Sequence, residues 1–157
     1  MVAHPRPGSG PTTPLAWFLW VDGARTGPEN MAWDHTLALG LPPGLGLVRL
    51  YGWARPTLSL GRNEPARDVF DPERLLAQGV DLVRRPTGGR SVLHDRELTY
   101  TVVAPLKALG GARAAYALVN RGLAEGLATL GVPAALAASG PTLPPDAGPC
   151  FQEPVEG

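Results

Sequence analysis

The sequence predicts an α+β domain in which a mixed, mainly antiparallel sheet is flanked by helices. Short apolar runs with the composition of strands recur along the chain, and segments with helical spacing or helix-capping residues interrupt them. Runs of strands broken by a few helices are typical of α+β domains. The chain contains no internal repeat, no G-x-G-x-x-G motif and no P-loop in the context that those motifs require.

The N-terminal half is predicted to hold three strands and one helix. Residues 15–22 (LAWFLWVD) are aromatic-rich and form a short strand, after which two glycines bracket a turn. A helix is predicted to begin at Pro28 and to run to about Leu39, where a glycine and a Pro-Pro pair stop it. The two remaining strands of this half are 45–53 and 57–61.

A short helix follows, with Asp71 as its N-cap, Pro72 at its first position and Gln78 near its end. Residues 81–85 are predicted to form a strand that ends in a tight turn at Pro86 to Gly89. Two further strands, 91–94 and 98–103, have a period that fits a hairpin, so we expect them to pair with each other.

The last predicted helix covers Ala112 to Leu130, because apolar residues recur there at helical spacing and Gly131 follows. Residues 132–138 (VPAALAA) are predicted to form a further strand.

Composition limits what kind of protein this is. The 157 residues carry 14 Lys and Arg against 14 Asp and Glu, so a broad nucleic-acid-binding surface is not expected. Residues 1–14 and 139–157 hold nine of the eighteen prolines and look like extended polar arms around a globular interval. No segment approaches the roughly 20 apolar residues of a membrane span, and no export signal is recognised, so the cytoplasm is the expected compartment.

The most unusual stretch is RRPTGGRSVLHD, residues 84–95. Glycines let a ligand approach main-chain N–H groups closely, and the two leading arginines can bind a carboxylate or a phosphate. The same letters also fit an ordinary hairpin turn with surface arginines. His94 and Asp95 are neighbours in a strand and point to opposite faces, so they do not readily act on one atom.

Two other groups of polar residues have both a structural and a functional interpretation. In the helix that begins at Pro28, the side chains of Met31, Asp34, His35 and Ala38 share one face. The structural interpretation, which we favour, puts Met31 and Ala38 in the core with the polar pair at its rim. Arg62 and Asn63, in a loop after a strand, either line a cleft or are solvated.

The single cysteine, Cys150, excludes an internal disulfide and lies in the loop sequence GPCFQEP. Structural cysteines usually sit inside a helix or strand, whereas a loop position beside Gly, Pro and an aromatic suits a thiol that is presented to a ligand. A free thiol has a pKa of about 8.5, so a catalytic role would need a nearby cation or base.

Four blocks in this order resemble the biotin and lipoate protein ligase superfamily, in particular its lipoate-ligase-like branch. The blocks are ENMAWDHTLAL (29–39), WARPTLSLGRNEP (53–65), RRPTGGRSVLHDRELTYTVVAP (84–105) and PCFQEP (149–154). The resemblance implies that residues 15–157 form the N-terminal portion of a catalytic domain like that of biotin ligases and class II aminoacyl-tRNA synthetases. It further implies a sheet that is incomplete at the C-terminal end, with an unpaired edge.

The resemblance also implies roles for individual residues. The arginine and glycine loop would hold the acyl carbonyl and its carrier, and Cys150 would accept the acyl group. Arg90 stands where ligases of the group commonly have a third glycine, which favours the branch that uses an acyl carrier protein. The residues implied to bind substrate are Arg84, Arg85, Thr87, Gly88, Gly89, Arg90, Ser91 and His94.

The function that the resemblance implies is transfer of octanoyl from octanoyl-acyl carrier protein, through a Cys150 thioester, to a lysine of a lipoyl-domain protein such as the glycine-cleavage H protein. No metal or other cofactor is expected. A first alternative is an ATP-dependent lipoate-protein ligase, which would use ATP and magnesium. A second is a binding domain without catalysis, and biotin transfer is a weaker third.

One departure from the family pattern bears on all of these alternatives. Relatives continue beyond the cysteine into a strand-turn-strand segment with an active-site lysine, and this chain stops first. The only lysine, Lys107, does not match that segment. The expectation is therefore a chain that is truncated relative to the family.

Overall fold

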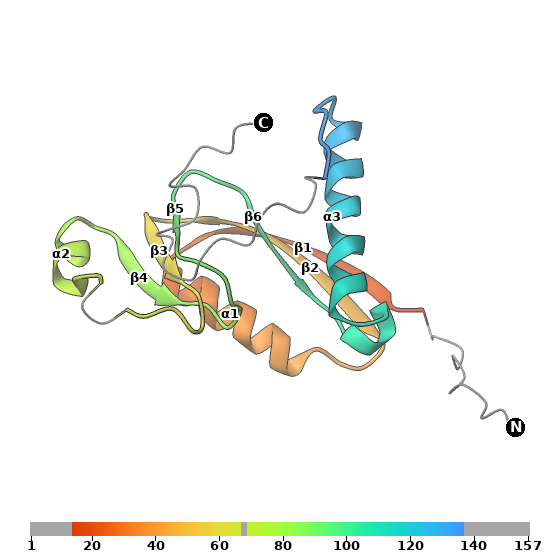
Figure 1. Cartoon of the computed structure of the whole chain (residues 1–157), viewed down its shortest axis with the longest axis horizontal. Coiled ribbons are helices and arrows are strands. Elements are labelled where there is room, and N and C mark those ends of the chain that lie inside the picture. Colours follow the sequence, from red (N-terminus) through yellow and green to blue (C-terminus); the bar gives the residue numbers. More distant parts are fainter. Residues whose placement is uncertain (1–13, 67–68, 137–157) are drawn as a thin grey trace, which may run out of the picture.

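We analysed a computed structural model of the chain, which describes residues 14–66 and 69–136. Helices interrupt runs of one to three strands along the chain (Figure 1). In order they are β1 (Ala16–Arg25), α1 (Gly27–Gly40), β2 (Leu45–Trp53), β3 (Thr57–Leu60), α2 (Pro72–Ala77), β4 (Asp81–Arg84), β5 (Val92–His94), β6 (Thr99–Val103), the 3₁₀ helix η1 (Leu106–Leu109) and α3 (Ala112–Thr129).

The six strands form two three-stranded sheets with the same pattern of directions. In the first sheet, ordered β1-β2-β6, β2 runs parallel to β1 and antiparallel to β6. In the second sheet, ordered β4-β3-β5, β3 runs parallel to β4 and antiparallel to β5. The predicted α+β class and mixed sheet are therefore confirmed, with the described strand pairs divided evenly between the two directions.

Local sequence explains where the helices begin and end. The backbone N–H of Thr26 donates to the carboxylate of Glu29 at 2.9 Å, which makes a capping box at the start of α1. Asp71 caps α2 by accepting hydrogen bonds from two backbone N–H groups, as its position before Pro72 predicts. Gly131 follows α3 at a φ of +77°, a left-handed conformation that favours glycine.

The core of the first sheet contains a buried cation, the guanidinium of Arg49 on β2. Its side chain is 0% exposed, and its five N–H groups make five hydrogen bonds. The acceptors are the carboxylates of Asp22 (2.8 Å) and Asp34 (2.8 Å) and two oxygens of Asn30. The ring of Tyr51 lies 4.0 Å from the guanidinium carbon. This network holds β1 and α1 against β2.

Asp34 extends the network to the third strand of the sheet. Its second carboxylate oxygen accepts hydrogen bonds from the hydroxyls of Tyr51 on β2 (3.1 Å) and Thr101 on β6 (2.8 Å). Burial of the Tyr51 hydroxyl, with the Asp34 carboxylate beside it, raises the pKa of Tyr51 to about 12. One carboxylate on α1 thus contacts two of the three strands directly and the third through Arg49 and Asp22.

The prediction of which α1 side chains are buried is wrong in part. Asp34 is buried, but His35 and Ala38 are exposed, and Asn30 takes the place predicted for an apolar contact. The reason is the cation opposite: Arg49 requires oxygen ligands, so a polar pair and not an apolar pair faces the sheet.

Two predictions about strands are also wrong. Residues 91–94 and 98–103 contain strands but form no hairpin, because β5 pairs with β3 whereas β6 pairs with β2. The turn between them carries the chain from one sheet to the other. Residues 132–136 form no strand, since Pro133 lacks an N–H group and alanine has low strand propensity; residues 137–138 lie outside the described part.

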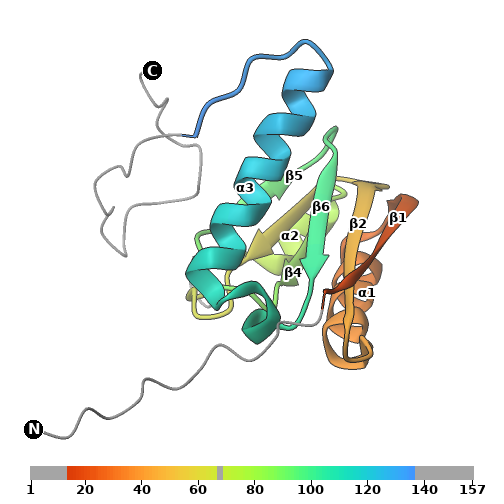
Figure 2. The same ribbon diagram turned by 90° about the vertical axis from the view of Figure 1, so that its right-hand side faces the viewer.

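The face of the first sheet that turns away from α1 is apolar. Trp20 and Asp22 of β1 contact α1 and the Arg49 network, so the alternating residues Trp17, Leu19 and Val21 point to the other side, where they are exposed. Among the described residues, β1 and β6 are the edge strands of this sheet. Figure 2 shows α1 and α3 on different sides of this sheet.

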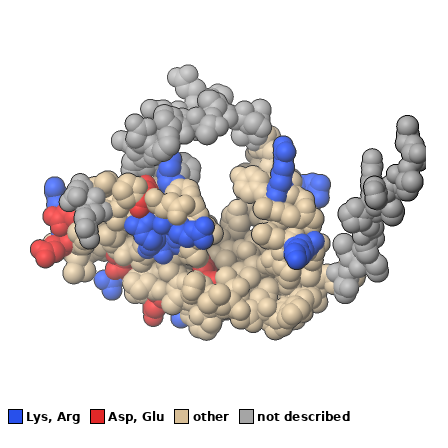
Figure 3. All heavy atoms as spheres, turned by 60° about the horizontal axis from the view of Figure 1, so that its bottom comes forward, with Lys and Arg blue, Asp and Glu red and all other residues tan. Residues whose placement is uncertain are grey.

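The face in Figure 3 is mostly uncharged, with Lys and Arg in small groups, which agrees with the balanced charge of the sequence. None of the helices in the described ranges has the length and apolar character to cross a membrane.

We predict that Arg49→Met strongly destabilises the fold. The change leaves the buried carboxylates of Asp22 and Asp34 without their counter-ion, which costs about 3–5 kcal/mol in comparable pairs. Urea titration followed by circular dichroism measures the change, with Arg113→Met on the exposed side of α3 as the control. Equal urea midpoints for the two variants would contradict the role given to Arg49.

Candidate functional site

The RRPTGG segment forms a loop over the end of the second sheet. It connects β4 to β5, the two strands that flank β3, and the chain that leaves β3 turns beneath it at residues 61–64. The N–H of Arg62 donates to the carbonyl of Thr87 at 2.9 Å. A side chain at Gly61 would overlap the carbonyl oxygen of Gly89, so only glycine lets the two segments come this close.

Arg84 binds the turn that follows β3. One nitrogen of its guanidinium donates to the carbonyl oxygens of Gly61 (2.6 Å), Arg62 (3.2 Å) and Glu64 (2.8 Å). These carbonyl oxygens belong to a tight turn and have no strand partner, so Arg84 satisfies acceptors that a sheet would otherwise satisfy.

Arg85 does the same for the loop itself. One of its nitrogens donates to the carbonyl (2.8 Å) and the hydroxyl (3.1 Å) of Ser59 on β3. The other donates to the carbonyls of Gly88 (3.3 Å) and Arg90. The two arginines therefore bind main-chain oxygens, and Arg85 draws the carbonyl side of the loop toward the sheet.

Glu64 joins the two segments from the opposite direction. Its carboxylate accepts the N–H of Gly61 at 3.0 Å and the N–H of Ser91 at 3.0 Å. Partial burial opposes the charged form, but these two backbone donors and the nearby Arg85 outweigh it and hold the pKa of Glu64 below its ordinary value. The loop and the turn thus form one unit, which we call the arginine clasp: residues 61–64 and 84–91.

The N–H side of the loop is left available. Thr87, Gly88 and Gly89 are exposed, and within the described residues their backbone N–H groups donate to no acceptor. Gly89 has a φ of +96°, which orients its peptide in a way that other residues rarely adopt. Successive backbone N–H groups in such a loop can bind a carboxylate, a carbonyl oxygen or an oxyanion.

The structure brings most of the predicted site residues together, but it gives several of them roles toward the protein itself. Arg84 and Arg85 bind main-chain oxygens, and Ser91 has a buried side chain while its N–H binds Glu64. Arg90 is half-buried, with its carbonyl accepting from Arg85. Cys150 lies outside the described residues.

His94 is also occupied by protein groups. Its Nε2 lies 2.8 Å from the hydroxyl of Ser59, its Nδ1 lies 2.6 Å from the carboxylate of Glu97, and its ring stacks on Trp53. The sequence-based expectation that His94 and Asp95 do not act on one atom agrees with this arrangement, since Asp95 is exposed.

Sequence reasoning missed three residues of this region: Ser59, Glu64 and Glu97. Ser59 looks like an ordinary strand residue in TLSLG, and Glu97 lies in a turn with other charged residues. Glu64 offers the best signal, since an acid three residues after Gly61 in a tight turn is placed to accept that glycine's N–H. Arg62 and Asn63, by contrast, have exposed side chains.

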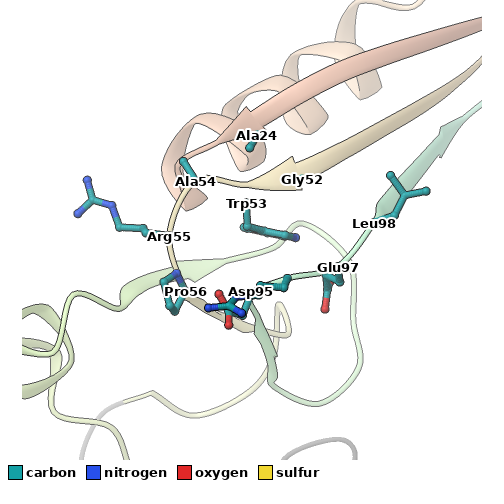
Figure 4. Close-up of a pocket in the computed structure, with 10 residues that line it drawn as sticks. Ala24, Gly52, Trp53, Ala54, Arg55, Pro56, Asp95, Glu97 and Leu98 are labelled. Carbon is teal, nitrogen blue, oxygen red and sulfur yellow. The ribbon is translucent and has the colours of Figure 1, made fainter.

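A pocket of about 600 Å³ opens beside this region, between the β2–β3 connection and the turn at residues 95–98. Figure 4 shows the Trp53 side chain directed into it, with Glu97 and Leu98 along one wall. Across the described ranges, no three His, Cys, Asp or Glu side chains cluster closely enough to hold a metal ion.

The sequence and the fold match a known family. Residues 26–140 match the family described as lipoyl protein ligase A/B catalytic domain, and the chain belongs to this family. The predicted resemblance to this family is thereby confirmed, and the matched residues contain three of the four sequence blocks, without the block at 149–154.

Two curated relatives carry the description octanoyltransferase LipM. That of Symbiobacterium thermophilum is 44% identical over 126 residues, which cover 76% of this chain and 45% of the relative. That of Kyrpidia tusciae is 42% identical over 123 residues, covering 73% and 44%. The chain thus spans less than half the length of the curated relatives that it matches.

Solved structures agree on the fold. A bipartite lipoate protein ligase from Thermoplasma acidophilum superposes with a TM-score of 0.64 at 20% identity, covering 78% of this chain and 49% of that one. Lipoate-protein ligase A bound with ATP gives 0.61 at 20% identity, covering 82% and 53%. At 20% identity, the similarity to these two structures shows that the chain shares their fold.

We predict that Gly61→Ala disturbs the arginine clasp. The added methyl group would meet the carbonyl of Gly89, so the loop has to move away from the turn and the hydrogen bond from Arg62 to Thr87 breaks. The backbone amide resonances of Gly88 and Gly89 should shift in NMR spectra. Gly126→Ala, where a new methyl group meets open space on α3, is the matched control and should leave them in place.

We predict that the Ser91 amide resonance titrates with the ionisation of Glu64, with a midpoint below the ordinary glutamate value of about 4.3. Folding lowers the pKa of Glu64, so the ionised carboxylate stabilises the folded state. This stabilisation is complete above the ordinary glutamate pKa and is lost as the pH falls through the lower pKa of the folded state. NMR between pH 2 and 7, an interval of about five units around that value, measures this midpoint. Glu64→Gln should abolish the titration; a midpoint at or above the ordinary value would contradict the hydrogen bonding described.

Proposed function

We propose that this chain belongs to an octanoyltransferase that moves octanoyl from octanoyl-acyl carrier protein, through a thioester on Cys150, to a lysine of a lipoyl-domain protein such as the glycine-cleavage H protein. The observation that carries the proposal is the clasp, whose arginines hold the carbonyl groups while exposed N–H groups at 87–89 are left for a ligand. The 44% identity to an octanoyltransferase favours this donor among the family's reactions.

The loop residues would act by binding the reacting carbonyl oxygen. As a nucleophile adds to a thioester carbonyl, its oxygen gains negative charge, and preorganised N–H groups stabilise that charge without having to reorient. Thr87, Gly88 and Gly89 supply such groups, and Arg85 keeps them in place through its bonds to the neighbouring carbonyls. Arg85 would therefore support catalysis by holding the loop in shape.

The reaction consists of two acyl transfers. In the first, the Cys150 thiolate adds to the octanoyl carbonyl, the bond to the carrier's sulfur breaks, and the carrier leaves as a thiol after taking up a proton. In the second, a neutral lysine amine adds to the Cys150 thioester, loses a proton and forms an amide, while the Cys150 sulfur departs. Each step exchanges one acyl bond for another, so no oxidant or nucleotide is needed.

The proposal predicts a covalent octanoyl adduct on Cys150. Incubation with octanoyl-acyl carrier protein in the absence of ATP should add the mass of one octanoyl group to the chain, as measured by intact-mass spectrometry. The adduct should be removed by hydroxylamine, which cleaves thioesters, and should be absent from Cys150→Ala.

The Symbiobacterium thermophilum relative, treated in the same way, is the positive control. No adduct on this chain beside a modified control would contradict the proposal for this chain. If the chain instead attaches lipoate to an acceptor in a reaction that requires ATP and that survives Cys150→Ala, the ligase alternative is supported. Binding of a lipoyl domain with neither reaction would support the non-catalytic one.

A further inference from the structure

Four polar side chains form a directional series of hydrogen bonds next to the clasp. Trp53 can only donate, and its indole N–H binds the hydroxyl of Thr99 at 2.8 Å. That hydroxyl in turn donates to the carboxylate of Glu97 at 2.8 Å. The same carboxylate oxygen lies 2.6 Å from Nδ1 of His94, whose ring stacks on Trp53 at 4.1 Å between centroids. Glu97 and the ring of His94 are therefore fixed in position.

The neighbours of the His94 ring favour one tautomer of the neutral imidazole. An ionised carboxylate only accepts, so Nδ1 of His94 carries a hydrogen and donates it to Glu97. In the neutral ring, Nε2 is then an acceptor, and its neighbour at 2.8 Å is the hydroxyl of Ser59. The Ser59 hydroxyl has two acceptors nearby, Nε2 of His94 at 2.8 Å and the carbonyl oxygen of Val92 at 3.4 Å, and the shorter contact is the better hydrogen bond. With its hydrogen directed to His94, the Ser59 oxygen is free to accept from Arg85 at 3.1 Å.

The Ser59, His94 and Glu97 side chains have the order of a hydrolase triad, but they cannot work as one. Ser59 is 0% exposed, so no acyl group can reach its hydroxyl. Its oxygen also accepts a hydrogen bond from Arg85, which lowers its nucleophilicity. The series instead ends at Arg85, whose second nitrogen holds the carbonyls of Gly88 and Arg90.

We propose that Ser59, His94 and Glu97 form a positioning relay that orients Arg85 and thereby holds the N–H groups of the RRPTGG loop in their binding arrangement. This inference rests on the proposed function, because the loop is the group that would bind the acyl carbonyl. It changes the role expected for His94 from a substrate contact to a residue that acts through Arg85. Glu97 also forms a wall of the neighbouring pocket, which makes it the part of the relay nearest to solvent.

The first test is the tautomer of His94 in the 157-residue chain. Nitrogen-15 chemical shifts of the imidazole distinguish a protonated Nδ1 from a protonated Nε2, and His94→Gln assigns the signal among the three histidines. We expect hydrogen on Nδ1 and an acceptor at Nε2. Hydrogen on Nε2 in the wild-type chain would overturn the proposal.

The second test removes the carboxylate. In Glu97→Leu, the tautomer signature should be lost, the amide resonances of Gly88 and Gly89 should shift, and their heteronuclear NOE values should fall. Glu97→Gln, whose amide oxygen can still accept from Nδ1, should restore the loop signals. Asp95→Asn is the matched control, because Asp95 lines the same pocket and is exposed like Glu97, but has no hydrogen bond in the described region.

Unchanged loop resonances in a folded Glu97→Leu would overturn the relay. If that variant does not fold, Ser59→Ala is the second break in the series, and unchanged loop resonances there would overturn it equally. Where the wild-type chain forms the octanoyl thioester, Glu97→Leu should slow its formation by about tenfold to a hundredfold, the effect of a misplaced binding group. If the wild-type chain forms no octanoyl thioester while the NMR results are as expected, the proposed function is rejected and the positioning relay is still supported.

Discussion

The fold depends on one buried charge. Arg49 has no exposed side-chain surface, and each of its five N–H groups reaches an oxygen of Asp22, Asn30 or Asp34. A buried guanidinium is tolerated only if its donors are satisfied, so the positions of β1 and α1 on β2 are tied to one another. Replacing any acceptor with an apolar group would leave a charge in the core, which limits this side of the sheet to one packing arrangement.

The second sheet uses arginine in a different way. Arg84 and Arg85 bind carbonyl oxygens of the turn and the loop, where no strand is available to satisfy them, and Arg85 also binds Ser59 of β3. Residues 87–89 are exposed, and their N–H groups donate to no acceptor within the described residues. Under the proposed function, the interaction that stabilises this irregular loop also prepares it to bind an oxygen atom of a ligand.

The two halves of the molecule meet at α1 and Trp53. The N–H of Gly27, at the start of α1, donates to Asp81 of the second sheet at 3.1 Å, while Asp34 further along binds the first sheet. Trp53 ends β2 in the first sheet and stacks on His94 in the second. The position of the loop is thus linked to both sheets, so the Arg49 network and the clasp support a single arrangement.

The sequence by itself determined most of the helix and strand segments, the α+β class, the family and the glycine-rich loop, because caps, apolar spacing and a contiguous motif are local. It did not determine which strands pair: residues 91–94 and 98–103 suit a hairpin by pattern, yet each joins a different sheet. Nor did it reveal that Arg84 and Arg85 bind main-chain oxygens, or that Ser59 and Glu97 flank His94. Those partners lie up to 35 residues apart along the chain. Only the tertiary structure decides such contacts, since a polar side chain's partner is set by what folding brings beside it.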